Sequence, residues 1–496
     1  MKAWVWSACS RPEVASVMQR ITAQSSAPLF DVAASRRIEQ AAGAQLPPHT
    51  LMRRAGLAVA HLAAALTPHA RCIWIACGPG NNGGDGFEAA TQLKLREFEP
   101  YVSFAGDEAR LPADALDALQ RARAAGVSIG REPPADYDLA IDALLGLGAA
   151  RAPADTMAQW LERMYRAGRP VLSVDLPSGL NADTGAAAFD FGHHGDRHSL
   201  TLLTLKPGLF TAHGRDAAGE VWFDDLGCAP GQEVAAAHLN APPTMAQRAH
   251  AAHKGSYGDV AILGGAPGMA GAAMLAASAA LHGGAGRVFV ALLDKALPAL
   301  SPTQPELMFR KAASLDWSQL TVVCGCGGGT AIHAMLPQVL ADAPRAVIDA
   351  DALNAIAADS ALQPLLAARR QRGQQTLLTP HPLEAARLLG TDTGTVQSDR
   401  LAAACALAAR FQSVVVLKGS GSVIAAPQAA PFINLSGNAR LATGGTGDVL
   451  AGMIGANLAA GHDAVAAARR AVWHHGALAD NWPAARPLTA GALAAG

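Results

Sequence analysis

Charged and aromatic residues are scarce in this chain of 496 residues, at 16% and 5%, and only seven cysteines are present. Seven is an odd and sparse number of cysteines, which excludes a disulfide framework. Lys and Arg total 39 against 40 for Asp and Glu, so the net charge is -1. This balance provides no overall basic field, and we expect neither nucleic acid nor a membrane as a partner.

Long uninterrupted apolar runs are also missing. The longest, Ala270–Leu293, contains His282, Arg287 and several glycines. It therefore predicts a helix, a turn and a strand in a core and not a membrane span. The N-terminal stretch MKAWVWSACSRPEV lacks the continuous apolar segment of a signal peptide. We accordingly expect a cytoplasmic protein, and we expect it to form a homo-oligomer.

Hydrophobic residues are plentiful, at 50%, and 50 glycines are present. Short β-branched runs alternate with alanine-rich stretches in both halves of the chain, which is typical of α/β domains with parallel sheets. A polar stretch with Pro242 and Pro243 separates the halves. We predict two α/β domains, residues 26–227 and 246–496, joined by a linker at residues 228–245.

A glycine-rich segment follows the first predicted strand of the N-terminal half, Cys72–Cys77. Its sequence is GPGNNGGDG, and we expect a helix to follow from about Phe87. The glycines permit close approach to a ligand, and amides at the helix start favour a phosphate. The segment is neither a Walker A loop nor a regular G-x-G-x-x-G motif. A purely structural turn is the alternative interpretation.

Two aspartates end predicted strands beside this segment. Asp142 follows the apolar run Leu139–Ile141, and Asp175 ends the predicted strand Val171–Asp175. The carboxyl ends of neighbouring parallel strands meet at one edge, so a shared polar site is expected there. Capping of a helix is the alternative role for each carboxylate. Asn82, Asp142 and Ser178 are hard oxygen donors, which suit an alkali or alkaline-earth ion.

The motifs GPGNNGGDG, IDALLGLG, SVDLPSGLNADTG and LKPGLFTAHG, in this order, resemble the NAD(P)H-hydrate epimerase family. The resemblance implies a Rossmann-like three-layer domain that binds a nicotinamide cofactor hydrated at C6. Asp175 would be catalytic, and Asn82, Asp142 and Ser178 would hold K⁺. The hydrate would contact Asn81, Asn82, Gly83, Gly84, Asp85, Gly146, Leu147, Gly148, Ala149, Ala150, Arg151, Ala152 and Asp175. Glu88 departs from the family pattern, which usually has an apolar residue there.

The C-terminal half contains the sequence GGTGDVL, with glycines before a predicted helix. Amides at such a helix start form an anion site, and Asp448 within it is placed to deprotonate a hydroxyl. Asp448 as a simple helix cap is the alternative. Lys418 follows the predicted strand Val414–Leu417, and His381 follows another strand end, between two prolines. A structural role is the alternative interpretation of His381.

The motifs HKGSYG, GMAGAA, TPHPLEA, LKGSG and NARLATGGTGDVLAG resemble the ADP-dependent NAD(P)H-hydrate dehydratase family, of ribokinase-like fold. By this resemblance Asp448 is catalytic, ADP is the co-substrate and Mg²⁺ assists. The residues implied to contact the hydrate are Ala272, Gly327, His381 and Asp448. Those implied to contact the nucleotide are Lys418, Gly419, Ser420, Gly421, Ser422 and Gly447.

Together the two resemblances predict one repair enzyme for hydrated NADH and NADPH. It would interconvert the R and S hydrates at C6 and dehydrate the S form at the expense of ADP. The first alternative is a ribokinase-like kinase for a vitamin precursor, such as a hydroxymethylpyrimidine or thiazole alcohol. The second is a nucleotide-binding module without catalysis in the N-terminal half.

Overall fold

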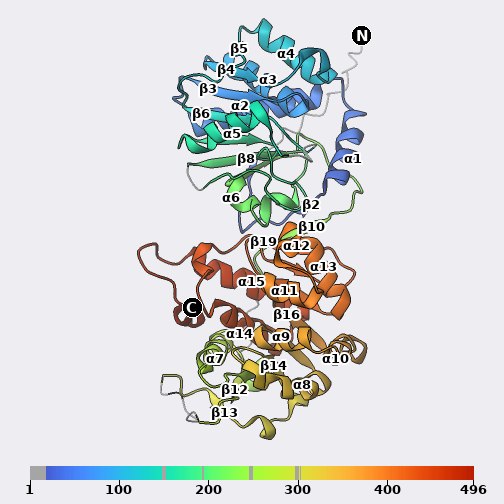
Figure 1. The fold of residues 1–496 in the computed structure, drawn as a ribbon, viewed down its shortest axis with the longest axis vertical. Coiled ribbons are helices and arrows are strands. Elements are labelled where there is room, and N and C mark those ends of the chain that lie inside the picture. The colour runs from blue at the N-terminus through green and yellow to red at the C-terminus, as the bar shows by residue number, and fades with distance from the viewer. Residues whose placement is uncertain (1–17, 148–151, 193–194, 245–249, 297–300, 302) are drawn as a thin grey trace, which may run out of the picture.

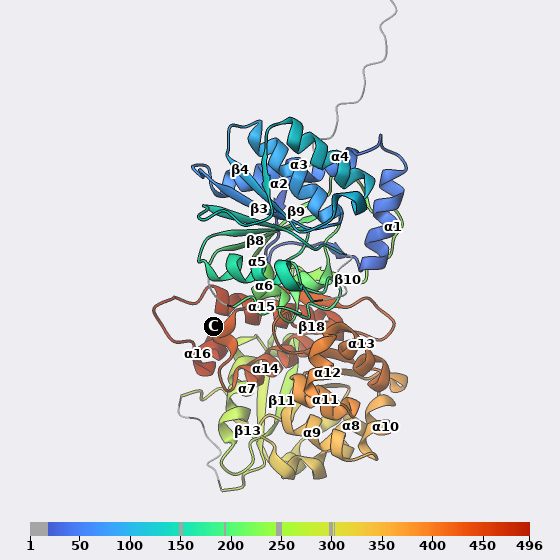
Figure 2. The same ribbon diagram turned by 45° about the horizontal axis from the view of Figure 1, so that its top comes forward.

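Two α/β domains lie end to end along the long axis of the molecule (Figure 1). The computed structural model describes residues 18–147, 152–192, 195–244, 250–296, 301 and 303–496. Each domain has a mostly parallel sheet with helices on both faces (Figures 1 and 2). The predicted α/β class is therefore confirmed.

The first sheet has eight strands, all parallel to their neighbours except the antiparallel first one. Their order in space is β1 (Gln19–Arg20), β9 (Glu220–Asp224), β8 (Arg197–Leu202), β7 (Val171–Val174), β6 (Leu139–Ala143), β3 (Ile73–Cys77), β4 (Pro100–Phe104) and β5 (Ser128–Gly130).

Alternate residues of β3 face opposite sides of this sheet, as the twofold repeat of a strand requires. Ile73 and Ile75 are buried in one apolar cluster, and Trp74 and Ala76 in another. The first cluster lies beneath α2 (Thr50–Leu66), α3 (Asn81–Lys94) and α4 (Ala113–Ala124). The second lies beneath α5 (Asp155–Arg166) and α6 (Gly214–Ala218), and α1 (Val32–Gly43) flanks the domain (Figure 1).

The second sheet has eleven strands. Their order is β13 (Met308–Phe309), β12 (Arg287–Leu292), β11 (Asp259–Gly264), β14 (Thr321–Cys324), β15 (Arg345–Ile348), β16 (Gln375–Leu378), β17 (Val414–Leu417), β18 (Val423–Ala425), β19 (Phe432–Asn434), β10 (Ala237–Asn240) and β2 (Pro28–Leu29). Strands β13 to β17 run parallel, and β18 reverses direction.

Helices cover both faces of this sheet too, because alternate residues of β11 enter different cores. Val260 and Ile262 belong to one cluster, and Ala261 and Leu263 to the other. The first cluster includes α7 (Ala270–His282), α14 (Thr446–Ala459), α15 (Ala464–Asp480) and α16 (Ala490–Ala495). The second includes α8 (Leu336–Asp342), α9 (Ala350–Ala358), α10 (Leu362–Ala367), α11 (Pro382–Leu389), α12 (Thr393–Ser398) and α13 (Arg400–Phe411).

The stretch predicted to be a linker contributes a strand. β10 pairs in parallel with β19 and antiparallel with β2, so two segments outside residues 246–496 complete the second sheet. Leu239 of β10 and Ile433 of β19 share an apolar cluster with Leu209 and Phe210. The sequence hides β10 because it is only four residues long and two prolines follow it closely. The two domains therefore share a core.

Among the described residues, no helix is both long enough and apolar enough to cross a membrane. The six cysteines in this part of the chain are all free. One strand end differs from the prediction: β7 stops at Val174, one residue before Asp175. The shorter β7 leaves Asp175 just beyond the strand, in the left-handed region at φ 68°.

Glu88, the departure from the family pattern, is buried on α3. Its side chain is 1% exposed, and its carboxylate pairs with Arg121 of α4 at 2.8 Å. Gln92 Nε2 donates to the other carboxylate oxygen at 2.9 Å. Arg121 thus supplies the positive charge that balances the buried negative charge of Glu88.

Replacing Arg121 by methionine should destabilise the protein by about 2 kcal/mol, because it leaves a buried carboxylate without its cation. This loss of stability is smaller than that expected for a fully buried ion pair, because the Arg121 side chain is 26% exposed. Thermal melting of the full chain measures the effect. Adding Glu88→Leu to Arg121→Met should restore most of the lost stability. A double variant less stable than Arg121→Met would contradict this account.

Candidate functional site

The glycine-rich segment after β3 forms the first turns of α3. The helix begins at Asn81, six residues before Phe87, and Gly80 is its N-cap. The prediction of a loop up to Phe87 is wrong because glycine is a poor helix former, so the sequence gives no helix signal here. A Cβ on Gly83 would overlap the Gly78 carbonyl, so this packing requires glycine. The helix start lies at the strand ends, as expected.

A cavity of about 490 Å³ is lined by residues that follow β3, β6 and β7. Of the residues predicted to contact the hydrate, those that line it are Asn81, Asn82, Asp85, Gly146, Leu147 and Asp175. Gly83 and Gly84 are instead buried within α3, and Ala152 is not among the lining residues that the structure describes. The predicted contacts Gly148, Ala149, Ala150 and Arg151 lie outside the described residues.

The cavity has a further wall that the sequence did not indicate. Ser35, Arg36 and Glu39 of α1 line it, together with Thr204. The Ser35 and Thr204 hydroxyls lie 2.8 Å apart and are both buried. No motif marks α1, whose approach to the cavity depends on the tertiary fold.

Asp175 forms a buried ion pair with Lys206. The Leu202 amide also donates to the Asp175 carboxylate at 3.2 Å. Lys206 is fully buried, and its Nζ donates to the Leu202 carbonyl at 2.8 Å and to the Thr201 hydroxyl at 3.1 Å. The ammonium therefore neutralises and fixes the carboxylate. Sequence reasoning missed this role, because no local pattern links Lys206 to a carboxylate 31 residues away.

The pKa values of two more carboxyl groups of this cavity are raised. Burial, followed by repulsion from the Asp175 carboxylate, raises the pKa of Asp85 well above its usual range. The same two causes raise the pKa of Glu39. Asp175, by contrast, has Lys206 as its counter-ion. The cavity thus places two carboxyl groups in different electrostatic environments, an arrangement used in acid–base chemistry.

The three residues expected to hold a cation lie together. The Ser178 amide and hydroxyl donate to the Asp142 carboxylate at 2.9 and 2.6 Å. Asp142 is fully buried, and this burial raises its pKa to about 6. The Asn82 amide nitrogen is buried without a partner among the described residues. Turning that amide by 180° would present an oxygen, so the donor set fits a hard cation.

The helix-capping interpretation does not hold for Asp142. Its carboxylate accepts hydrogen bonds from Ser178 and from the Leu144 amide at 3.3 Å, whereas the next helix, α5, begins only at Asp155. The same alternative fails for Asp448 in the C-terminal domain. Gly445 is the N-cap of α14, and no side chain in the described structure caps this helix. Asp448 lies in the first turn, with its carboxylate available for chemistry.

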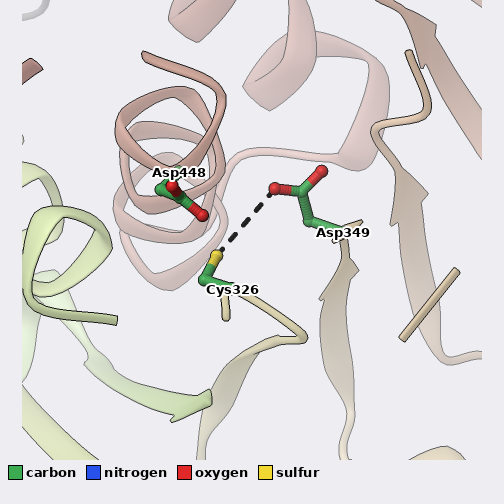
Figure 3. A group of neighbouring side chains, drawn as sticks. All are labelled: Cys326, Asp349 and Asp448. Carbon is green, nitrogen blue, oxygen red and sulfur yellow. Dashed lines mark hydrogen bonds between the residues drawn. The ribbon is translucent and has the colours of Figure 1, made fainter. Parts of the chain in front are cut away.

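Asp448 lies beside Cys326 and Asp349 (Figure 3). One ligand atom from each of the three residues lies within 4.8 Å of the other two. Burial and the neighbouring Asp349 carboxylate raise the pKa of Asp448 to about 6. Cys326 was not among the residues predicted for this site. It is fully buried, but its Sγ lies 3.9 Å from Asp349 Oδ2 at the centre of the site.

Lys418 points toward this centre. Its Nζ lies 2.9 Å from Asp349 Oδ1, and the Thr379 hydroxyl donates to the same oxygen at 2.7 Å. A Cβ on Gly447 would lie 3.3 Å from the Lys418 ammonium, so the glycine-rich helix start adjoins it. Burial would lower the pKa of Lys418, but Asp349 and Glu384 outweigh this effect and raise it. Lys418 thus favours its charged form and forms an ion pair with Asp349.

His381 serves as the N-cap of α11. Its Nδ1 accepts from the Leu383 amide at 3.1 Å, and its own amide donates to Glu384 at 2.8 Å. Burial and then Lys418 lower its pKa, so the ring favours the neutral form. Ala272 and Gly327 are direct neighbours, because a Cβ on Gly327 would lie 2.9 Å from the Ala272 methyl. Gly419, Ser420, Gly421 and Ser422 continue directly from Lys418.

Comparison with known proteins covers both domains. The profile described as "YjeF-related protein N-terminus" matches residues 48–208, and the NAD(P)H-hydrate dehydratase profile matches residues 260–495. The Escherichia coli K12 bifunctional NAD(P)H-hydrate repair enzyme Nnr is 37% identical over 462 residues, covering 90% of this chain and 87% of that protein. The chain belongs to the bifunctional NAD(P)H-hydrate repair enzyme family. The two resemblances in the sequence are thereby confirmed.

Two further similarities concern the C-terminal domain. The ADP-dependent (S)-NAD(P)H-hydrate dehydratase of Neisseria meningitidis serogroup B is 43% identical, covering 52% of this chain and 88% of that protein. A crystal structure of the Bacillus subtilis ADP/ATP-dependent NAD(P)H-hydrate dehydratase, co-crystallized with ATP/Mg²⁺, is 31% identical. The match covers 51% of this chain and 91% of the Bacillus subtilis chain, with a TM-score of 0.43. As a member of the repair enzyme family, this chain joins the two domains in one polypeptide.

Proposed function

We propose that this enzyme restores hydrated NADH and NADPH, with the N-terminal site epimerising C6 and the C-terminal site dehydrating the S form at the expense of ADP. The proposal rests on one observation. A single chain of the repair family contains two buried carboxylate centres, one around Asp175 and Lys206 and one around Asp448, Asp349 and Lys418. Each centre adjoins glycine-rich backbone at a helix start.

The epimerase step needs a proton donor and a stabiliser of positive charge. C6 of the hydrate carries both a hydroxyl and the ring nitrogen. Protonation of the hydroxyl by a carboxylic acid releases water as the C–O bond breaks, and the nitrogen lone pair forms an iminium. We assign the acid to Asp85, whose pKa is raised, and cation stabilisation to the Asp175 carboxylate. Water then adds to the opposite face, and the proton returns to a carboxylate.

We further propose that Asn82, Asp142 and Ser178 hold K⁺ beside this cavity, where it would supply a fixed positive charge near the bound hydrate. The orphaned Asn82 amide and the buried Asp142 carboxylate support the proposal. The polar side chains that line the cavity, among them Asn81 and Asp85, would position the hydrate. Proton donation stays with Asp85 and stabilisation of the iminium with Asp175.

KCl should raise the melting temperature of the protein, whereas the same concentration of LiCl should not. At a hundredfold excess over Kd, binding to the native state contributes about 2.7 kcal/mol. Asn82→Ala should abolish this K⁺-specific increment with little effect in K⁺-free buffer, since the buried Asn82 nitrogen has no partner in the described residues. Equal effects of both salts on both proteins would contradict the K⁺ site.

For dehydration, we assign Asp448 as the general base. It removes the proton of the C6 hydroxyl, and the oxygen forms a bond to the terminal phosphorus of ADP while the bond to AMP breaks. The ring nitrogen then expels phosphate to give the iminium, and transfer of a proton from C5 to the released phosphate restores the dihydropyridine. Lys418 and the amides at the start of α14 stabilise the phosphoryl charge.

The Asp349 carboxylate fits Mg²⁺, which binds through one or two carboxylates and the phosphates of a substrate, and leaves Asp448 free to act as the base. The ion would neutralise phosphoryl charge when bound. The Cys326 thiol is a soft ligand and does not suit this ion. Cytoplasmic location and assembly into a homo-oligomer stay predictions.

The test is to add racemic NADH hydrate to the purified protein with ADP, Mg²⁺ and K⁺. Near-ultraviolet absorbance of the dihydronicotinamide should return for both epimers. Recovery that stops near half would assign activity to the C-terminal site alone. No recovery with ADP or ATP would overturn the proposal, and turnover of a hydroxymethylpyrimidine or thiazole alcohol would identify a kinase.

A further inference from the structure

The loop at residues 418–422, proposed to bind the nucleotide, packs against the N-terminal domain. The Ala212 amide donates to the Ser420 carbonyl at 3.2 Å. The Thr211 hydroxyl lies 3.4 Å from the Ser420 carbonyl and 3.3 Å from that of Gly421. Gly421 has φ 61°, and a Cβ there would overlap the Phe210 carbonyl. The two backbones are therefore in direct contact, which only glycine permits.

Arg400 connects the end of β17, the loop at residues 418–422 and Thr211 from within the core. It is 1% exposed, and its Nη2 donates to the Leu417 and Lys418 carbonyls at 3.2 and 3.1 Å. Its Nε donates to the Thr211 hydroxyl at 3.2 Å. The fourth partner is Gln397, at 2.7 Å. No carboxylate in the described chain pairs with this guanidinium, so its partners are neutral oxygens.

The segment that carries Thr211 also reaches the epimerase site. Lys206, the partner of Asp175, immediately precedes the short 3₁₀ helix η2 (Pro207–Phe210). At the other end of the contact, Lys418 pairs with Asp349. Residues 206–212 thus contact Asp175 of one centre and the loop that follows Lys418 of the other. Leu209 and Phe210 of this segment are buried with Ile433 of β19, so it is fixed on both sides.

We propose that Thr211 and Arg400 are positioning residues for the nucleotide loop, so that the N-terminal domain completes the ADP site of the dehydratase. The inference rests on the function proposed above. A loop with two glycines among its five residues loses much conformational freedom when a ligand orders it. Bonds from Thr211 and Arg400 order the loop beforehand, and preorganisation raises affinity. The unpaired positive charge of Arg400 also favours the anionic phosphates.

The experiment compares Thr211→Val with Thr211→Ser in the full-length protein, by ADP titration calorimetry. Valine matches the shape of threonine but cannot donate, so the Kd for ADP should rise about fivefold. Serine keeps the hydroxyl and should stay within about twofold of wild type. Hydrogen exchange of the amides at residues 419–422 should accelerate only in the valine variant. Epimerisation rates should not change in either.

Two further proteins make the result decisive. Thr91→Val removes a buried hydroxyl bond to the Phe87 carbonyl on α3, far along the helix from the cavity, and should leave ADP affinity unchanged. Arg400→Lys keeps the charge but loses the fork that joins Thr211 to two carbonyls, and should raise the Kd about tenfold. If Thr211→Val does not fold, the Arg400→Lys variant takes its place in the test.

Wild-type ADP affinity in Thr211→Val or Arg400→Lys would overturn the inference, as would an equal loss in Thr91→Val. A drop in stability with unchanged ADP affinity would show a merely structural role and overturn it too. Failure of the wild-type protein to bind ADP would instead overturn the proposed function. The KM for ADP should change with the Kd, while the KM for the hydrate should not.

Discussion

Replacing Asp448 by asparagine is expected to lower the kcat for dehydration of the S hydrate by about 10²–10⁴-fold, the usual contribution of a general base. Asparagine keeps the shape of the side chain in the first turn of α14 but cannot accept the hydroxyl proton. Because no side chain caps this helix in the described structure, the substitution removes no cap. Single-turnover formation of the dihydronicotinamide, with ADP and pure S hydrate, measures the loss.

The wild-type pH profile offers an independent check. Burial raises the pKa of Asp448 to about 6, and a general base works only when ionised. The rate of dehydration should therefore fall about tenfold per pH unit below pH 6 and should be flat above it. Epimerisation in the same Asp448→Asn protein should stay at the wild-type rate. A loss below tenfold, or loss of ADP binding together with the rate, would contradict the role as base.

One simple rule explains why so much of the site could be predicted. In a parallel α/β sheet, polar side chains just beyond the strand ends converge on one edge. This rule found Asp142 and Asp175 after buried strands, and glycine next to a helix start drew attention to Asp448. Asp349 follows the rule equally well, directly after β15 (Arg345–Ile348), and the sequence should have revealed it.

The partners of these carboxylates could not be predicted, because they depend on the tertiary packing. Lys206 reaches Asp175 across 31 residues of chain, and Arg400 reaches Thr211 across 189. Nothing in the local pattern of either residue indicates its partner. For the same reason α1 gave no sign that it walls the cavity, and the four-residue β10 was interpreted as a linker.

Replacing Asp175 by asparagine is expected to slow epimerisation by about 10²–10⁴-fold, because the iminium would lose its stabilising carboxylate. With racemic hydrate, ADP and Mg²⁺, absorbance should then recover rapidly to about half and afterwards only at the spontaneous rate. Pure S hydrate should be dehydrated as fast as by the wild type. Full rapid recovery from the racemate would contradict the role of Asp175.

One confounding effect needs its own variant, because Asp175 is the ion-pair partner of the fully buried Lys206. Asp175→Asn leaves this ammonium without an anion, which destabilises a protein strongly and could distort the cavity. Adding Lys206→Met removes the unpaired charge and should restore the melting temperature. Epimerisation should nevertheless stay slow in the double variant, because methionine cannot replace the carboxylate. Recovery of the epimerase rate together with the stability would mean that Asp175 acts only through the fold.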